Sequence, residues 1–513
     1  MATRDTLVTR FERVARRHPE AVAFEHDGRT VTYRELPARV GAVQRLLPVG
    51  AGRIGLLGTR SLAACLGYLA VLRTGAATVP LNPAFPADRN LAVCRLAGVD
   101  TVLTDGCAPD SVLRHYRDAG LTVVRVPDPD PTAPPPPPPP AAPTDPDAEA
   151  YVLFTSGSTG VPKGVPVRHR NAVAFLDHLV PHYGFGVGAR VALAVDLVFD
   201  PSVIGLFGSV CSGATAVLPV AQEALTPTHF VRARDITHLF SVPSAIVRAG
   251  QLRLLGPNSL PSLRWSGFGG EPLTAEQAGA WAAAAPASRI ANVYGPTELT
   301  VFCTGYDLPP DPAHWPATSN GTVPIGRVHP GHDWLLLTPD GRPGEDGELC
   351  VRGPQRFTGY TDPAADDGRF FAYDPAAPHL PPVVHDGGAP LTAAHWYRTG
   401  DRVRLEHGTL VHVGRLDRQV KVRGFRVELA DVETGLRRVA GVSGAAVVRT
   451  ADTTLHAFHT GSRLTQEELL AALREWLPPY MLPARTSWLP ELPLNHNGKV
   501  DHRRLTELLP QRT

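Results

Sequence analysis

The chain has few of the residues and segments that mark disulfide-bonded, metal-binding or membrane proteins. Its 513 residues include only six cysteines, none with the C-x-x-C spacing of a zinc or redox site. No segment is long and apolar enough to span a bilayer, and the amphipathic N-terminus lacks the apolar core of a signal peptide. Because 50 basic residues balance 49 acidic ones, no bulk charge attracts nucleic acid or an anionic membrane. We therefore expect a cytoplasmic globular protein.

Strand-like and helix-like segments alternate through the first part of the chain. Such repetition predicts a mostly parallel sheet covered by helices. The expected elements are a hairpin at 22–24 and 30–32, a strand at 53–57, a helix at 62–72 and a strand at 78–81.

A proline-rich run extends from Pro127 to Pro146 and can join neither a sheet nor a helix. We expect an exposed polyproline II insertion, with a ligand for a proline-binding module as the alternative. Strands resume on both sides, so the run should not separate domains.

We place the domain boundary near 414–418 instead, which gives an N-terminal domain at 1–414 and a C-terminal domain at 415–513. The expected fold class is α/β: a large N-terminal domain of β-sheets with flanking helices, plus a small mobile C-terminal α+β domain. The elements expected in the smaller domain are strands at 419–422 and 445–449 and helices at 429–438 and 466–476.

Residues 151–164 form the most informative segment, a short apolar strand followed by a loop rich in glycine and hydroxyl groups. Glycines let backbone N–H groups turn toward a ligand, while hydroxyls add donors and a lysine adds charge, so the loop can cradle a polyphosphate. It is not a P-loop, because Pro162 and Gly164 break that pattern. A flexible surface loop remains the alternative. The candidate phosphate-binding residues are Thr155, Ser156, Gly157, Ser158, Thr159, Gly160 and Lys163.

This loop resembles the phosphate loop of adenylate-forming enzymes, and the likeness runs nearly end to end. The segments 32–36 and 72–81 resemble two early structural motifs of the same family. The chain as a whole resembles a stand-alone amino acid adenylation enzyme of the nonribosomal-peptide type, within the ANL superfamily. The resemblance implies that ATP and a carboxylic acid form an acyl-AMP with release of pyrophosphate, with Mg²⁺ as cofactor.

Segment 292–298 resembles the part of the family that lines the adenine pocket. An aromatic face, a Gly-Pro turn and one carboxylate suit a nucleotide and metal site. The resemblance places Tyr294 against the base and makes Glu298 the Mg²⁺ ligand and, with Thr155, a catalytic residue. A surface turn is the alternative. The nucleotide-binding residues implied here are Asn292, Tyr294, Gly295 and Thr297.

The resemblance also assigns ribose and hinge residues. Asp401 ends a motif at 397–401 in which an aspartate accepts from both ribose hydroxyls, a role that suits an acceptor-only carboxylate. Segment 414–428 resembles the hinge motif, with Asp417 as the pivot, Arg415 near the ribose and Arg426 near the phosphates. The alternatives are a Gly-Asp turn and an ordinary charged hairpin.

Segment 493–501 resembles the loop that carries the catalytic lysine, here Lys499, and 477–483 matches the motif upstream of it. A lone lysine near a C-terminus is usually a solvated surface group. The resemblance instead places its ammonium between the substrate carboxylate and the α-phosphate.

Asp200 is the candidate that decides the class of acid. The resemblance pairs an aspartate at this position with the substrate ammonium; the alternative is that Asp200 caps a helix that begins at Pro201. An apolar pocket with two glycines for depth suits a small to medium apolar amino acid, such as a branched aliphatic one. A β-amino acid, as used in a polyketide or macrolactam pathway, and alanine also stay open. The pocket walls implied by the motifs are Pro201, Ile204, Phe240, Gly267, Gly269, Val293, Val301 and Phe302.

The acceptor is expected in trans, because the chain ends soon after Lys499 without a carrier motif. The resemblance implies a phosphopantetheinylated carrier protein, whose thiol attacks the adenylate after the C-terminal domain rotates. One rival is an acyl-CoA ligase that acts on an organic acid. The other is an idle homologue that only binds nucleotide, against which the full set of motif residues argues. The exact acid and the oligomeric state stay open.

Overall fold

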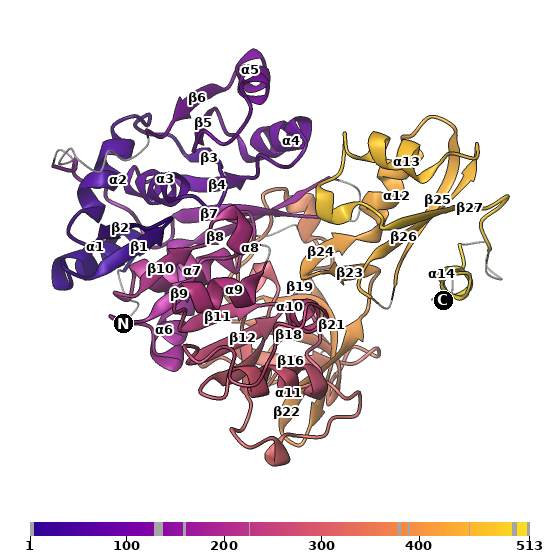
Figure 1. Ribbon diagram of the computed structural model, residues 1–513. Helices are drawn as coiled ribbons and strands as arrows, with labels where there is room; N and C mark the ends of the chain where they lie inside the picture. Colours follow the sequence, from indigo (N-terminus) through magenta and orange to yellow (C-terminus); the bar gives the residue numbers. More distant parts are fainter. Residues whose placement is uncertain are drawn as a thin grey trace.

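Three sheets and a smaller C-terminal unit make up the chain (Figure 1). The structure is a computed structural model that describes residues 5–127, 137–156, 161–224, 226–377, 381–387, 390–450, 452–494 and 500–509.

The first sheet has six strands in the order β6-β5-β3-β4-β7-β8 and is parallel except for the β7–β8 pair. Its strands are β3 (Arg53–Leu57), β4 (Ala77–Leu81), β5 (Thr101–Thr104), β6 (Thr122–Arg125), β7 (Glu149–Thr155) and β8 (Lys163–Arg168). The helices between them are α3 (Leu62–Arg73), α4 (Ala87–Ala97) and α5 (Asp110–Asp118).

The second sheet has nine strands in the order β15-β14-β13-β12-β11-β9-β10-β1-β2. Its strands are β1 (Val22–His26), β2 (Arg29–Thr32), β9 (Arg190–Ala192), β10 (Thr215–Leu218), β11 (His238–Ser241), β12 (Trp265–Gly269), β13 (Arg289–Tyr294), β14 (Thr304–Asp307) and β15 (Arg327–Val328). The helices along this part of the chain are α1 (Leu7–Arg17), α2 (Leu36–Gln44), α6 (His169–Tyr183), α7 (Ser202–Val210), α8 (Ala221–Ala224), α9 (Pro227–Ala233), α10 (Pro243–Gln251) and α11 (Ala275–Ala284), with the short 3₁₀ turns η1 (Thr297–Leu299) and η2 (Pro312–His314).

A layer of helices shares one apolar core with the first two sheets, which are mostly parallel. Helix α3 is the clearest case, because all of its 12 residues are buried and its sequence is almost wholly apolar. It contacts α1, which in turn contacts α6 and α7, and residues of all four helices belong to the same buried cluster. A helix that is apolar all round must be covered on every side, so the sequence of α3 requires this central position.

The third sheet is antiparallel and completes the larger domain. Its strands are β16 (Asp333–Leu337), β17 (Pro343–Gly344), β18 (Asp346–Arg352), β19 (Phe370–Ala372), β20 (Val383–Val384), β21 (Trp396–Glu406) and β22 (Thr409–Arg415), with the 3₁₀ turn η3 (Pro363–Asp366) before β19.

The C-terminal unit is α+β and has its own apolar core. It consists of a two-stranded hairpin, β23 with β24, and a three-stranded sheet, β25-β26-β27, with helices packed on it. These elements are β23 (Gln419–Val422), β24 (Phe425–Glu428), α12 (Leu429–Arg437), β25 (Val442–Arg449), β26 (Leu455–Gly461), α13 (Gln466–Leu473), η4 (Pro479–Met481), β27 (Arg485–Trp488) and α14 (His502–Glu507). In Figure 1 they lie to one side of the parallel sheets, in orange to yellow.

The expected elements of both regions are present. The β1–β2 hairpin, β3, α3 and β4 match the prediction to within two residues at most ends, and so do β23 and α12. Helix α13 ends three residues earlier than predicted, at Leu473. The α/β fold class with a smaller α+β domain is confirmed.

The described part of the proline-rich run lies on the surface beside α2. Gln44 Nε2 donates to the Pro140 carbonyl at 3.1 Å, and Arg45 donates to the carbonyl of Pro137, which is exposed. The run joins β6 to β7 of one sheet, so it separates no domains. Within the described ranges, no helix has the length and apolarity to cross a membrane.

Candidate active site

Those predicted site residues that the structure describes gather where the carboxyl ends of parallel strands from two sheets meet the antiparallel sheet. Strand β7 ends at Thr155, β12 ends at Gly269 and β13 ends at Tyr294. In open α/β sheets this edge is where ligands bind. The site therefore lies where the topology predicts one.

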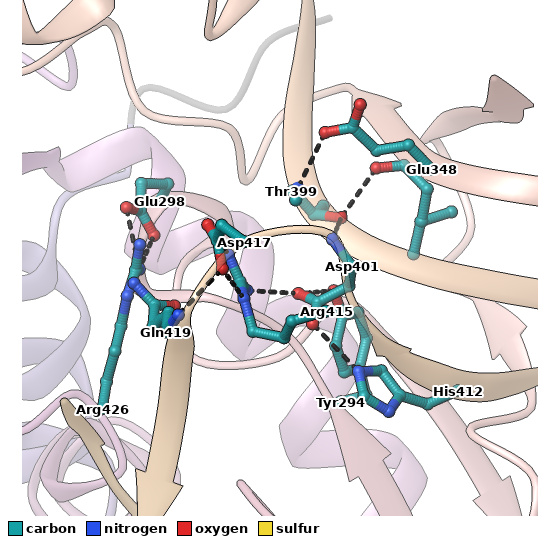
Figure 2. Close-up of polar contacts among 12 residues, drawn as sticks. Tyr294, Glu298, Glu348, Thr399, Asp401, His412, Arg415, Asp417, Gln419 and Arg426 are labelled. Carbon is teal, nitrogen blue, oxygen red and sulfur yellow. Dashed lines mark hydrogen bonds and ion pairs between the residues drawn. The ribbon is translucent and has the colours of Figure 1, made fainter. Parts of the chain in front are cut away.

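Asp401 is hydrogen-bonded to three side chains of the site (Figure 2). Tyr294 Oη donates to Oδ2 at 2.8 Å, Arg415 Nη1 donates to Oδ2 at 2.9 Å and His412 Nε2 contacts Oδ1 at 2.9 Å. Burial acts to raise the pKa of this carboxyl, but His412 and Arg415 outweigh burial and lower it. Asp401 is thus an ionised acceptor with lone pairs to spare.

Arg415 joins the predicted ribose residue to the predicted hinge residue. While Nη1 bonds Asp401, Nε and Nη2 donate to the two Asp417 oxygens at 2.7 and 2.8 Å. Asp417 Oδ1 also accepts from the backbone N–H of Gln419 at 3.1 Å. Figure 2 shows this chain of contacts running from β21 to the first residue of β23.

Glu298 is fully buried and paired with Arg426 of the β23–β24 hairpin. Arg426 Nη1 donates to Oε1 at 2.9 Å and to Oε2 at 2.8 Å, and Tyr360 Oη donates to Oε1 at 2.6 Å. Although burial raises the pKa of the Glu298 carboxyl, the Arg426 charge and the Tyr360 hydrogen bond bring it below its usual value. The carboxylate is therefore ionised, and its charge is met by a guanidinium.

The start of the phosphate loop touches the same hairpin. Ser156 Oγ donates to the Arg426 carbonyl at 3.1 Å and accepts from the Glu428 N–H at 3.2 Å. Thr155 Oγ1 is buried and has no hydrogen-bond partner among the described residues. Lys163 Nζ lies 5.6 Å from the centre of the Tyr360 ring, and burial lowers the pKa of its ammonium.

Two groups of predicted residues lie outside the described residues. They are Gly157, Ser158, Thr159 and Gly160 of the phosphate loop, and the predicted catalytic residue Lys499.

The side chain of Asn292 is hydrogen-bonded within the protein. Its Nδ2 donates at 2.9 Å to the carbonyls of Val323 and Pro324, and the side chain is buried. Both amide hydrogens are therefore used within the protein. Gly295 is required for close approach, because a Cβ there would lie 2.5 Å from Phe302 Cα.

Asp200 does not cap the helix that follows it. Helix α7 begins at Ser202, and no side chain bonds its N-terminal N–H groups. Burial raises the pKa of the Asp200 carboxyl to about 6, while the Thr297 hydroxyl and the Lys421 ammonium oppose that rise. Lys421 stands opposite Arg426 in the β23–β24 register, so the hairpin brings one cation toward Asp200 and another to Glu298.

The two pocket glycines, Gly267 and Gly269, do not leave open space in the pocket. The prediction that they deepen it is therefore wrong. A Cβ on Gly267 would lie 2.3 Å from Phe240 Cδ1, and one on Gly269 would lie 2.6 Å from the Val293 carbonyl oxygen. The Phe240 ring therefore fills the space above Gly267. The Phe240 and Phe302 rings are stacked with centroids 6.2 Å apart.

The remaining predicted walls are apolar and mostly buried: Ile204, Val293 and Val301 are 3%, 7% and 6% exposed. Pro201 is half-buried and directly precedes α7.

An aromatic cluster joins the C-terminal unit to the residue before Asp200. Phe425 of β24 lies 4.7 Å from Phe199 and 4.6 Å from Tyr480, centroid to centroid. Tyr480 also lies 5.8 Å from Phe85 of the larger domain. Sequence reasoning missed this cluster, although Phe425 and Tyr480 fall within the motifs at 414–428 and 477–483 and Phe199 directly precedes Asp200. It also missed Lys421, Tyr360 and His412.

In the described part of the chain, no group of three or more His, Cys, Asp and Glu side chains could hold a metal ion.

Comparison with known proteins decides the family. Residues 11–361 match the family model for "AMP-binding enzyme". The chain belongs to the AMP-binding enzyme family. Its relatives further show that this AMP-binding enzyme is an amino acid adenylation enzyme of the nonribosomal-peptide type, that is, an AMP-forming ligase.

Two curated relatives illustrate the similarity. The chain is 34% identical over 528 residues to phosphinothricin tripeptide synthetase PhsC of Streptomyces viridochromogenes, covering 99% of this chain and 45% of PhsC. It is 33% identical over 522 residues to phenyloxazoline synthase MbtB of Mycobacterium sp. (strain MCS), covering 98% and 42%. The chain thus spans less than half the length of these relatives.

Several solved structures are similar to this chain over nearly its whole length. IdnL7 is 36% identical with a TM-score of 0.70, and 99% of each chain is covered. The Vibrio cholerae adenylation domain AlmE, in complex with glycyl-adenosine-5'-phosphate, is 26% identical with a TM-score of 0.80, covering 98% of this chain and 97% of AlmE. PA1221, a nonribosomal peptide synthetase protein with adenylation and carrier (PCP) domains, is 26% identical with a TM-score of 0.77, covering 98% of both.

Proposed function

We propose that the protein activates a small apolar amino acid as its aminoacyl-AMP and passes the aminoacyl group to the thiol of a separate phosphopantetheinylated carrier protein. The observation that carries this proposal is Asp200, a carboxylate whose pKa is raised to about 6 by burial and which lies just before helix α7 and the predicted wall residues Pro201 and Ile204. Such a carboxylate is costly unless a cation meets it; Lys421 of the hairpin supplies one in this orientation, and the ammonium of an amino acid would take its place when the hairpin withdraws. The substrate carboxylate would then point toward the nucleotide.

The chemistry needs no acid–base residue in its first step. The substrate carboxylate is already ionised and attacks the α-phosphorus of ATP in line, while pyrophosphate leaves with the electron pair of the broken P–O bond. Catalysis is then positioning and charge stabilisation. In the second step a carrier thiol attacks the acyl carbonyl, loses its proton to solvent and releases AMP.

The nucleotide would be held by groups that the fold already orients. Asp401 accepts the ribose hydroxyls, with its charge maintained by Arg415 and His412. Thr155 Oγ1 offers a buried donor that has no partner among the described residues, which suits a phosphate oxygen.

Glu298 has the chemistry of a Mg²⁺ ligand, because it is an ionised oxygen donor beside the phosphate loop. When bound, Mg²⁺ would neutralise charge on the triphosphate. In the orientation seen here Glu298 is committed to Arg426, so it can take this role only once the guanidinium withdraws.

The C-terminal domain would therefore work in two orientations. In the present orientation the β23–β24 hairpin points into the site. Helix α14 packs on β25 at the outer side of the domain (Figure 1), and it follows soon after Lys499 in the chain. We place the boundary at residues 414/415 and the pivot at Asp417, which Arg415 grips in this orientation. After rotation, Lys499 would bridge the substrate carboxylate and the α-phosphate during adenylate formation.

Pocket size favours a small side chain. Phe240 fills the space above Gly267, and Phe302 stacks behind it, so little room is left for a branched or aromatic substrate. The likeness to AlmE, which was solved with a glycyl adenylate, supports a small amino acid.

Pyrophosphate exchange into ATP tests the proposal across glycine, alanine, β-alanine, valine, leucine and phenylalanine. We expect exchange with the smallest amino acids, and with leucine or valine only after Phe240→Ala. Exchange with phenylalanine but not alanine in the wild-type protein would refute the size argument. A holo carrier protein and free coenzyme A, offered separately, then distinguish a carrier ligase from an acyl-CoA ligase.

A further inference from the structure

The turn that carries two pocket residues has an unusual backbone. Thr300 and Val301 both have positive φ, at 56° and 73°. The Phe302 N–H donates to the Thr300 carbonyl at 3.0 Å, so Val301 is the central residue of a three-residue γ-turn. With positive φ this turn is rare and strained, and more so for a β-branched residue. Something outside the turn must hold it.

A single buried amide holds it. Gln355, which has no exposed surface, directs its side-chain Nε2 at three carbonyls of the turn. The distances are 3.1 Å to Leu299, 3.3 Å to Thr300 and 2.8 Å to Phe302. The Thr300 hydroxyl Oγ1 also donates to the backbone carbonyl of Gln355 at 2.6 Å.

A histidine fixes which way this amide faces. His329 Nδ1 lies 2.9 Å from Gln355 Oε1. Because the amide oxygen can only accept, Nδ1 carries the hydrogen, and the amide nitrogen is left to face the turn. The His329 ring is buried, stacks on His178 at 3.7 Å and lies 5.4 Å from the Phe302 ring.

We propose that Gln355 is a positioning residue for substrate selection: its amide holds the strained turn Leu299–Phe302, and so sets where Val301 and Phe302 stand against the substrate side chain. This inference rests on the proposed amino acid pocket. Glu298, directly before the turn, is held by Tyr360 and not by Gln355, so the nucleotide site should not depend on Gln355.

Gln355→Glu is the sharpest test, because it keeps the shape and the acceptor for His329 but replaces the donor with an oxygen that faces three carbonyls. Asn171→Asp is a matched control. Asn171 is also a buried amide, and its Nδ2 donates to the carbonyls of Pro354 and Arg356, on either side of Gln355, but not to the turn.

Both variants are compared with the wild-type protein in pyrophosphate exchange. For Gln355→Glu we expect the amino acid KM to rise at least ~10-fold and discrimination between small and larger amino acids to weaken, with the ATP KM within about twofold. Asn171→Asp should lower Tm by a similar amount yet leave the amino acid KM unchanged. Equal KM effects in the two variants would overturn the proposal.

A readout that is independent of activity separates this proposal from the proposed function. Hydrogen–deuterium exchange of a peptide covering 297–304 should speed up in Gln355→Glu and stay slow in Asn171→Asp. Unchanged exchange there in Gln355→Glu would overturn the anchoring argument, even if the wild-type protein activates amino acids. If the wild-type protein shows no pyrophosphate exchange, the proposed function fails, and with it the role in selection.

Discussion

Arg426 donates from one guanidinium nitrogen to both carboxylate oxygens of Glu298, at 2.9 and 2.8 Å; Glu298 is buried and the Arg426 side chain is 14% exposed. The family resemblance assigns this same carboxylate to Mg²⁺. Because one guanidinium nitrogen bonds both oxygens in this orientation, we expect the ion pair to compete with a metal ion for the carboxylate and so to favour one state of the active site. Removing one partner of such a buried pair typically costs about 3–5 kcal/mol.

We predict that MgATP loosens the β23–β24 hairpin. Hydrogen–deuterium exchange over residues 419–428 should be slow in the free protein and faster with ATP and Mg²⁺ together. Arg426→Gln should show the faster exchange without any ligand, because its amide cannot replace the charge. Equal exchange in the free and MgATP-bound wild-type protein would contradict a competition at Glu298.

The activity should fall in acid because of Asp200. Its carboxyl has a pKa of about 6, raised first by burial, so it is charged above that pH and able to hold an ammonium. As the pH falls below about 6 the charge is lost, and kcat/KM for the amino acid should decrease about tenfold per pH unit.

Asp200→Asn provides the control for this acid limb. The variant should raise the amino acid KM about 10- to 100-fold and show no limb near pH 6, with the ATP KM little changed. An acid limb that persists in Asp200→Asn would assign it to another group.

Tyr480 should matter for transfer but not for adenylate formation. Its ring stacks on Phe425 and also contacts Phe199 and Phe85, and each aromatic pair contributes ~0.5–1.5 kcal/mol beyond burial. Tyr480→Ala should therefore slow loading of a carrier protein about tenfold while pyrophosphate exchange stays near wild type. Tyr480→Phe keeps the ring and should behave like wild type. Equal loss in both half-reactions would show that the cluster only stabilises the fold.

Lys499 should matter for adenylate formation but not for transfer to the carrier. Lys499→Ala removes the charge expected at the carboxylate and α-phosphate, and adenylate formation should slow by about 10²–10³-fold. Transfer from a chemically synthesised aminoacyl-AMP to the carrier should be nearly unaffected. An unchanged exchange rate would remove Lys499 from the catalytic set.

Local signals predicted several elements of the fold, whereas the family resemblance assigned the main site motifs. Turn residues marked the β1–β2 hairpin, and unbroken apolar sequence marked α3, so both were predictable. The motif residues Asp401, Arg415 and Asp417 do lie together, although 14 positions separate Arg415 from Asp401 along the chain.

Contacts between distant segments could not be predicted. His412 reaches Asp401 only because β22 pairs with β21, and Gln355 reaches the turn at 299–302 across more than 50 residues. The pocket depth was misjudged for the same reason. A glycine indicates space only until a neighbouring strand supplies a side chain to fill it, as Phe240 of β11 does over Gly267 of β12.

The central claim is that Asp200 selects acids that carry an amine, and one competition measures this directly. The protein is incubated with ATP, Mg²⁺ and equal concentrations of alanine and propanoate, which differ only in the amine, and the adenylates are quantified by mass spectrometry. We predict alanyl-AMP with propanoyl-AMP at least ~100-fold lower, because propanoate has no ammonium to pair with the Asp200 carboxylate. Propanoyl-AMP in comparable or greater amount would contradict the account and identify an organic acid ligase.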